Sequence, residues 1–271
     1  MPEPYILKLL GGLTLASPDG PLEGRVVQRR RLALLALLAA ARGRPVSRDK
    51  LIATLWPESP TERARHSLSD ALHVFHKVLG ERAIVTAGDE LWLDPEVVTS
   101  DAAAFEAAVE GGALERAVEL YGGPFLDGFF VSGAVEFDDW AAGERERLAR
   151  VYAGALERLA AEAAGRGDPG TAAGWWLQRS AQDPYDARVA VRFMEALAAA
   201  GDRAGAIQHA VAHAALLHRE LDAEADPVVT DLARRLRQEP VAWTPPGAAS
   251  LPSAAEGRPA GPPRRTTRWA P

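Results

Sequence analysis

The chain has 271 residues, no cysteine and a formal net charge of −6 at pH 7. That length accommodates one or two domains with their own cores, and the lack of cysteine excludes disulfides and thiolate zinc sites. The longest apolar run, residues 32–41, is about half of a membrane span, and the N-terminus lacks the basic and apolar segments of a signal peptide. We therefore expect a soluble cytoplasmic protein with no membrane partner.

Charge is distributed unevenly along the chain. Residues 25–82 hold 12 basic and 5 acidic residues, whereas residues 101–240 hold 14 basic and 24 acidic residues. An acidic body with one basic segment suits a protein that contacts a polyanion with one part only. Basic residues that are simply solvated on helix surfaces would give the same pattern.

The first hundred residues predict strands, three helices and a hairpin, in that order. Short apolar segments and the turn SPDG predict β-structure over residues 5–24. A Leu- and Ala-rich helix is predicted over residues 28–42, and a second over residues 47–56, where Ser47 is the N-cap and Pro57 ends the helix.

The third helix, ERARHSLSDALHVFHKVLG at residues 62–80, is the most strongly patterned. Its apolar residues Leu68, Leu72, Phe75 and Leu79 share one face. The preceding SPTE predicts a capping box with Ser59 as N-cap. The following AIVTAGDELWLDP predicts a hairpin, which completes the order of a winged helix.

Beyond Ser100 the sequence is helical and rich in alanine. Gly112, Gly167 and Gly201 are each followed five residues later by alanine, and the last two glycines are 34 residues apart, which is the tetratricopeptide (TPR) period. A long insert separates the first copy from the second. The sequence thus predicts a mainly α protein with a small β part. Its predicted parts are a winged helix-turn-helix (1–98), an all-α TPR-like domain (99–240) and a proline-rich flexible tail (241–271).

The sequence resembles a known family over about nine-tenths of its length. Residues 5–98 resemble the winged-helix output domain of bacterial two-component response regulators. Residues 99–240 resemble the bacterial transcriptional activator domain of the SARP-type activators (Streptomyces antibiotic regulatory proteins). The matching stretches are RRRLALLALLAAARGRPVSRDKLIATLWP, ARHSLSDALHVFHKVLG, DAAAFEAAV, YGGPFLDGF, WAAGERERL, GDRAGAIQHAVAH and ADPVV.

The resemblance implies sequence-specific binding of double-stranded DNA and recruitment of RNA polymerase to activate transcription. It also implies that the helical domain binds protein partners or assists formation of a homodimer. One departure concerns the end of the third helix, where the family usually has paired arginines and this chain has Val74-Phe75-His76-Lys77. This departure favours a rival hypothesis, in which the protein is a TPR-like scaffold whose winged helix no longer binds DNA.

On the DNA-binding hypothesis, polar side chains of the third helix contact bases and basic side chains contact phosphates. The start of the first helix adds free amide groups that favour an anion. The predicted base contacts are His66, Ser69, Asp70, His73 and His76. The predicted backbone contacts are Arg29, Arg30, Arg31, Arg48, Lys50, Arg65, Lys77 and, in the wing, Thr86. The alternative for this face of the third helix is an ordinary solvated surface.

No pattern in the sequence indicates an enzyme or a cofactor. The chain lacks a phosphate-binding GxxxxGK[ST] loop, GxGxxG, GxSxG and any cysteine nucleophile. His66, Asp70 and His73 have metal-ligand spacing, as do His209 and His213, but neither set has a further ligand nearby in sequence, so we expect surface histidines. Trp140, Trp175 and Trp176 are expected to fill space between helices.

Overall fold

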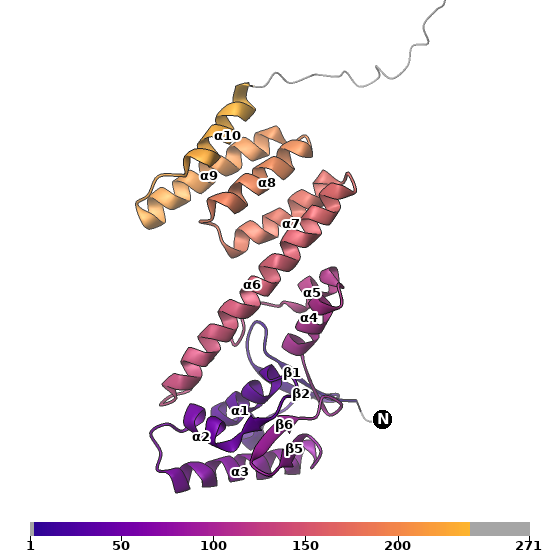
Figure 1. Ribbon diagram of the computed structural model, residues 1–271, viewed down its shortest axis with the longest axis vertical. Coiled ribbons are helices and arrows are strands. Elements are labelled where there is room, and N and C mark those ends of the chain that lie inside the picture. Colours follow the sequence, from indigo (N-terminus) through magenta and orange to yellow (C-terminus); the bar gives the residue numbers. More distant parts are fainter. Residues whose placement is uncertain (1–2, 239–271) are drawn as a thin grey trace, which may run out of the picture.

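The computed structural model describes residues 3–238. The predicted proline-rich tail lies outside the described residues. Figure 1 shows an N-terminal part of short strands and helices, the long helix α6, and a stack of helices at the far end of α6. Within residues 3–238 no helix is both long and apolar enough to cross a lipid bilayer.

The N-terminal part is a winged helix-turn-helix, as predicted. A four-stranded sheet in the order β3-β2-β1-β7 has β1 antiparallel to β2 and parallel to β7, and a three-stranded sheet in the order β4-β6-β5 forms the wing. The strands are β1 (Tyr5–Lys8), β2 (Thr14–Ser17), β3 (Gly20–Pro21), β4 (Val46–Ser47), β5 (Ile84–Ala87), β6 (Glu90–Leu93) and β7 (Val98–Ser100). The helices are α1 (Arg29–Ala40), α2 (Arg48–Leu55) and α3 (Thr61–Leu79), and a short 3-10 helix, η1 (Gly24–Val27), precedes α1.

Helix α2 begins and ends at the residues that the sequence predicted, with Ser47 as N-cap and Pro57 directly after the C-cap Trp56. The Ser47 side chain accepts a hydrogen bond from the amide of Lys50, and Gly80 ends α3 with φ 92°. The predicted capping box is wrong, because Pro60 is the N-cap of α3 and no side chain caps it. Ser59 instead belongs to the preceding turn, where its amide donates to the carbonyl of Trp56 at 3.1 Å.

The rest of the described chain is helical and paired. In each predicted copy of the repeat, the glycine lies in the turn between two paired helices. Its φ is 77° at Gly112, 74° at Gly167 and 85° at Gly201. The alanine five residues later is buried in each copy, so its small side chain lets the paired helices approach closely. The helices are α4 (Asp101–Glu110), α5 (Leu114–Leu120), α6 (Val135–Gly165), α7 (Pro169–Gln182), α8 (Ala187–Ala199), α9 (Arg203–Leu221) and α10 (Pro227–Gln238).

One hydrophobic core crosses the expected domain boundary at residues 98 and 99. Buried side chains of the winged helix, such as Leu34 and Phe75, belong to the same cluster as Phe105 of α4 and Phe137 of α6. A separate, smaller core joins α8, α9 and α10. The winged helix and the first three helices of the all-α part are therefore packed as one body.

The insert between α5 and α6 attaches this body to the first sheet. The amide of Leu126 donates to the carbonyl of Leu9 at 2.8 Å, and that of Gly11 donates to Pro124 at 3.0 Å. A side chain at Gly11 would place its Cβ 2.7 Å from the carbonyl oxygen of Gly122, and φ there is +79°, so only glycine fits.

The N-terminus of α4 makes a further attachment to the same sheet. The Asp101 carboxylate accepts hydrogen bonds from the amides of Leu9 at 2.7 Å and Leu10 at 3.0 Å. Burial raises the pKa of this carboxyl group, although these amides and that of Ala102 favour its ionised form.

The three tryptophans that were predicted to fill space between helices differ in their surroundings. Trp140 is partly buried against Phe125 and Phe137, with ring centroids 5.8 and 5.4 Å away, and Trp175 packs on the main core, as predicted. Trp176 is half-buried and lines an open cleft with Arg179 and Arg188. The prediction that it fills interhelical space is therefore only partly correct.

Candidate nucleic-acid interface

Helix α3 lies along the end of the molecule that is remote from α7–α10 (Figure 1). Its buried face carries Leu68, Leu72, Phe75 and Leu79. The opposite face carries a row of side chains at spacings of three, four, three and four residues, and all but Asp70 are exposed. We call this row the α3 stripe. It consists of Arg63, His66, Asp70, His73 and Lys77.

Arg63 was not predicted as a DNA contact. It begins the same helical row as His66 and His73, and this spacing in the sequence would have sufficed to include it. With Lys77 it gives the α3 stripe a cation near each end.

Arg31 is not available to a phosphate, so that prediction is wrong. Its side chain is 9% exposed and donates to the Asp70 carboxylate at 2.6 Å and to the carbonyl oxygen of Arg25 at 2.6 Å. The Oδ2 atom of Asp70 is held by Arg31, but the Asp70 side chain is 42% exposed, so its base contact stays a prediction. The Arg25 guanidinium lies 3.7 Å from the same oxygen. The one negative charge of the α3 stripe is thus balanced from within the protein.

Arg29 and Arg30 bind the insert between α5 and α6. Arg29 donates to the carbonyl of Phe130 at 3.0 Å and places its guanidinium carbon 5.4 Å from the centroid of the Phe129 ring. Arg30 donates to the carbonyl of Ser132 at 2.7 Å. These bonds give both arginines a role in holding the insert, and their phosphate contacts stay predictions.

His76, a predicted base contact, lies partly inside the protein. The ring is half-buried, and its Nε2 is enclosed in the protein without a hydrogen-bond partner among the described residues. This nitrogen cannot bind a base edge, so Nδ1 alone is left for the base contact, which stays a prediction.

The remaining predicted residues lie on three neighbouring elements. Arg65 and Ser69 of α3 line an open cleft of about 430 Å³ with Arg48 of α2 and Asp89 of the wing. The Arg48 amide donates to the carbonyl of Asp89 at 2.8 Å, which holds the wing tip against the start of α2. Lys50 is exposed on α2 and Thr86 is exposed on β5.

The charge balance of this surface differs between helix and wing. The only carboxylate within 4 Å of Arg65 in the described chain is Glu62, at 3.2 Å, and both side chains are more than half exposed, so this ion pair restrains Arg65 weakly. Asp89 and Glu90 are exposed at the wing tip, where they would repel phosphate. The cations that face solvent are therefore on α2 and α3.

The predicted metal spacings do not form a metal site within residues 3–238, where no three His, Cys, Asp or Glu side chains are grouped as ligands. The expectation of a surface residue is wrong for His213, which is 3% exposed and whose Nδ1 lies 3.0 Å from the carbonyl oxygen of Pro184, whereas His209 is half-buried. Burial, and secondly the neighbouring His213, lower the pKa of His209.

Comparison with known proteins identifies the helical part. Residues 97–237 match the model of the bacterial transcriptional activator domain. The chain belongs to this family. The resemblance to SARP-type activators drawn from the sequence is thereby confirmed. A search of curated proteins finds no match.

A solved structure of Mycobacterium tuberculosis EmbR in complex with a low-affinity phosphopeptide has a similar fold to this activator-domain protein. The TM-score is 0.61 at 21% sequence identity, and the match covers 88% of this chain and 66% of the EmbR chain. At this identity the likeness concerns the fold alone.

Proposed function

We propose that this protein is a transcriptional activator that binds double-stranded DNA through α3 and acts in the cytoplasm. The observation that carries the proposal is the α3 stripe. Arg63, His66, His73 and Lys77 are exposed on a helix that the rest of the winged helix supports from its apolar side. A helix of this kind fits the major groove, and its polar side chains reach base edges.

The proposed contacts divide into two groups. His66, Ser69 and His73 face bases, while cations at the ends of the α3 stripe and beside it neutralise phosphates. The second group is Arg63, Arg65, Lys77, Arg48 and Lys50, with Thr86 near the backbone of the adjacent groove. The wing contributes weakly because Asp89 and Glu90 are acidic.

The helical part is proposed to contact RNA polymerase, which the name of its family supports. One winged helix provides little contact area, so high specificity requires two copies of the protein on neighbouring half-sites. A homodimer on DNA is therefore part of the proposal.

The test is the salt dependence of DNA affinity, measured by fluorescence anisotropy on DNA fragments that bind the protein. The slope of log K against log salt is expected to be about −0.9 for each phosphate neutralised. The double variant Arg63→Ala/Lys77→Ala should weaken binding and make the slope shallower by up to about 1.8, which is 0.9 for each of two lost phosphate contacts.

A matched control removes two arginines elsewhere. Arg116 of α5 and Arg150 of α6 are exposed and paired only with neighbours on their own helices. Arg116→Ala/Arg150→Ala loses the same charge and should leave the slope unchanged. If both double variants have the same effect, net charge rather than α3 governs binding. If the unaltered protein binds no DNA, the scaffold hypothesis replaces this proposal.

A further inference from the structure

A cavity lies where the winged helix meets the all-α part. It has a volume of about 330 Å³, opens to solvent and is lined by the end of α1, the end of β6, β7 and the first turn of α4. Leu38, Leu93 and Val98 are buried and form its apolar floor. Ala39, Ala103 and Ala104 leave it open because their side chains end at Cβ. A cavity of this size and lining suits a small molecule, and such sites are frequent at junctions between domains.

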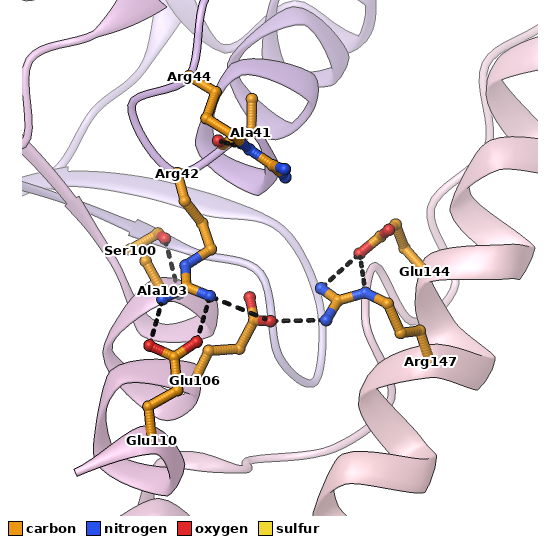
Figure 2. Close-up of polar contacts among 9 residues, drawn as sticks. All are labelled: Ala41, Arg42, Arg44, Ser100, Ala103, Glu106, Glu110, Glu144 and Arg147. Carbon is orange, nitrogen blue, oxygen red and sulfur yellow. Dashed lines mark hydrogen bonds and ion pairs between the residues drawn. The ribbon is translucent and has the colours of Figure 1, made fainter.

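The one charged side chain on this cavity is Arg42, just beyond the end of α1. Arg42 has a left-handed backbone, with φ 55°, and donates two hydrogen bonds to Glu110, at 2.6 and 2.8 Å (Figure 2). The Glu110 side chain is 62% exposed. An exposed carboxylate is easily rehydrated, so a ligand anion can take its place on Arg42 at little cost.

Arg42 also borders a second, polar cleft of about 490 Å³, which Arg44, Arg147 and Glu106 line. Glu106 is buried, accepts from Arg147 at 2.6 Å and lies 3.7 Å from the Arg42 guanidinium, so Arg42 keeps this second partner when Glu110 is displaced (Figure 2). Arg44 is different. Its side chain donates only to the carbonyl of Ala41, at 3.0 Å, and has no carboxylate within 4 Å among the described residues. The Arg42 guanidinium, which lines the apolar cavity, can therefore receive an anion there, while Arg44 lines only the polar cleft beside it.

We propose that this cavity binds a small amphipathic anion that regulates DNA binding. The apolar part of the ligand occupies the space above Leu38, Leu93 and Val98, and its acidic group replaces Glu110 on Arg42. The ligand then touches α1 and β6 of the winged helix and α4 of the all-α part at once. A ligand that alters their packing changes DNA affinity, and DNA changes ligand affinity by the same factor. This regulatory role, unlike the site itself, rests on the proposed DNA binding.

The site is tested first without DNA, on the full chain, with the fluorescent aromatic anion 8-anilinonaphthalene-1-sulfonate as probe. Decanoate is expected to displace one equivalent of probe about five- to tenfold more effectively than decanol, which has the same chain without the charge. Ala103→Leu fills the cavity and should weaken both ligands at least tenfold. Arg42→Gln should abolish the preference for decanoate and leave decanol binding unchanged.

Two control variants carry the same chemical changes at exposed positions. Ala161→Leu lies on α6 and Arg116→Gln on α5, both away from the cavity. Both should bind like the unaltered protein. Equal displacement by decanoate and decanol, or binding that Ala103→Leu leaves intact, overturns the proposed site.

The regulatory role is tested by measuring DNA affinity with saturating decanoate. A change of at least threefold is expected, and Ala103→Leu should abolish it. Unchanged affinity overturns the regulatory role. If the protein binds no DNA in either state, the proposed function fails, while probe displacement still decides whether the site exists.

Discussion

The contact between Arg31 and Asp70 leads to the most specific prediction about α3. Arg31 is almost fully buried and fixes the start of α1 to the middle of α3 through a carboxylate that is 42% exposed. A hydrogen bond between charged groups contributes about 1.5–3 kcal/mol. The partial exposure of Asp70 reduces this value through solvent screening. We therefore expect Arg31→Ala to lower the free energy of unfolding by about 2 kcal/mol, which corresponds to a melting temperature about 4–8 °C lower.

The same change should weaken DNA binding through electrostatics. Without Arg31, only the exposed Arg25, 3.7 Å away, partly balances the Asp70 charge that faces the DNA. At about 7 Å from a phosphate, a unit charge in a water-like medium costs about 0.6 kcal/mol, and more where the dielectric constant is lower. We expect affinity to fall about three- to tenfold.

Double-variant analysis separates the two effects. Arg31→Ala/Asp70→Asn removes the unbalanced charge, so DNA affinity should recover while the loss of stability remains. The measurements are thermal unfolding and anisotropy titration at fixed salt. The reasoning is refuted if Arg31→Ala unfolds at the same temperature as the unaltered protein, or if the double variant binds DNA as weakly as Arg31→Ala.

Three further predictions concern the rest of the described chain. Glu106→Ala leaves Arg147 without its buried partner and should lower the free energy of unfolding, measured in urea, by about 2 kcal/mol. The loss is smaller than for a fully buried pair because Arg147 is 37% exposed. Glu144→Ala removes the more exposed partner of Arg147 and should lower it less. Because burial lowers the pKa of His209 below its unfolded value of 6.5, protonation favours unfolding. Stability present above pH 6.5 should thus fall as the pH drops below that value, and His209→Gln should reduce this dependence, as urea midpoints at pH 8 and 5.5 will show. Ala206→Leu should cost about 1–3 kcal/mol by overpacking a fully buried position, whereas the exposed Ala161→Leu should not alter thermal unfolding.

Much of the fold could be predicted because its signals are local. Ser47, Pro57 and Gly80 bound the helices of the winged helix, and the glycine–alanine repeats mark turns of the helical stack, so the order of elements follows from short stretches of sequence. The shared core was not predictable in this way. It depends on contacts such as Leu126 to Leu9, which join residues more than a hundred positions apart.

The surroundings of the candidate site residues were predicted less well, because they too depend on contacts between residues far apart in the sequence. A run of three arginines at a helix start favours an anion, yet in the folded chain Arg30 binds a carbonyl 102 residues away and Arg31 binds a carboxylate 39 residues away. Neither partner can be inferred from the run itself. Arg63, in contrast, could have been found from helical spacing alone.

The central claim is that α3 binds specific DNA, and selection from genomic DNA tests it most directly. The protein and its Arg63→Ala/Lys77→Ala variant would each be mixed with fragmented DNA of the source genome at near-physiological salt, and the retained fragments sequenced. We expect the protein to retain fragments that share a short motif repeated about one helical turn apart, and the variant to lose them. Retention of no fragments, or of the same fragments by both proteins, would contradict the account.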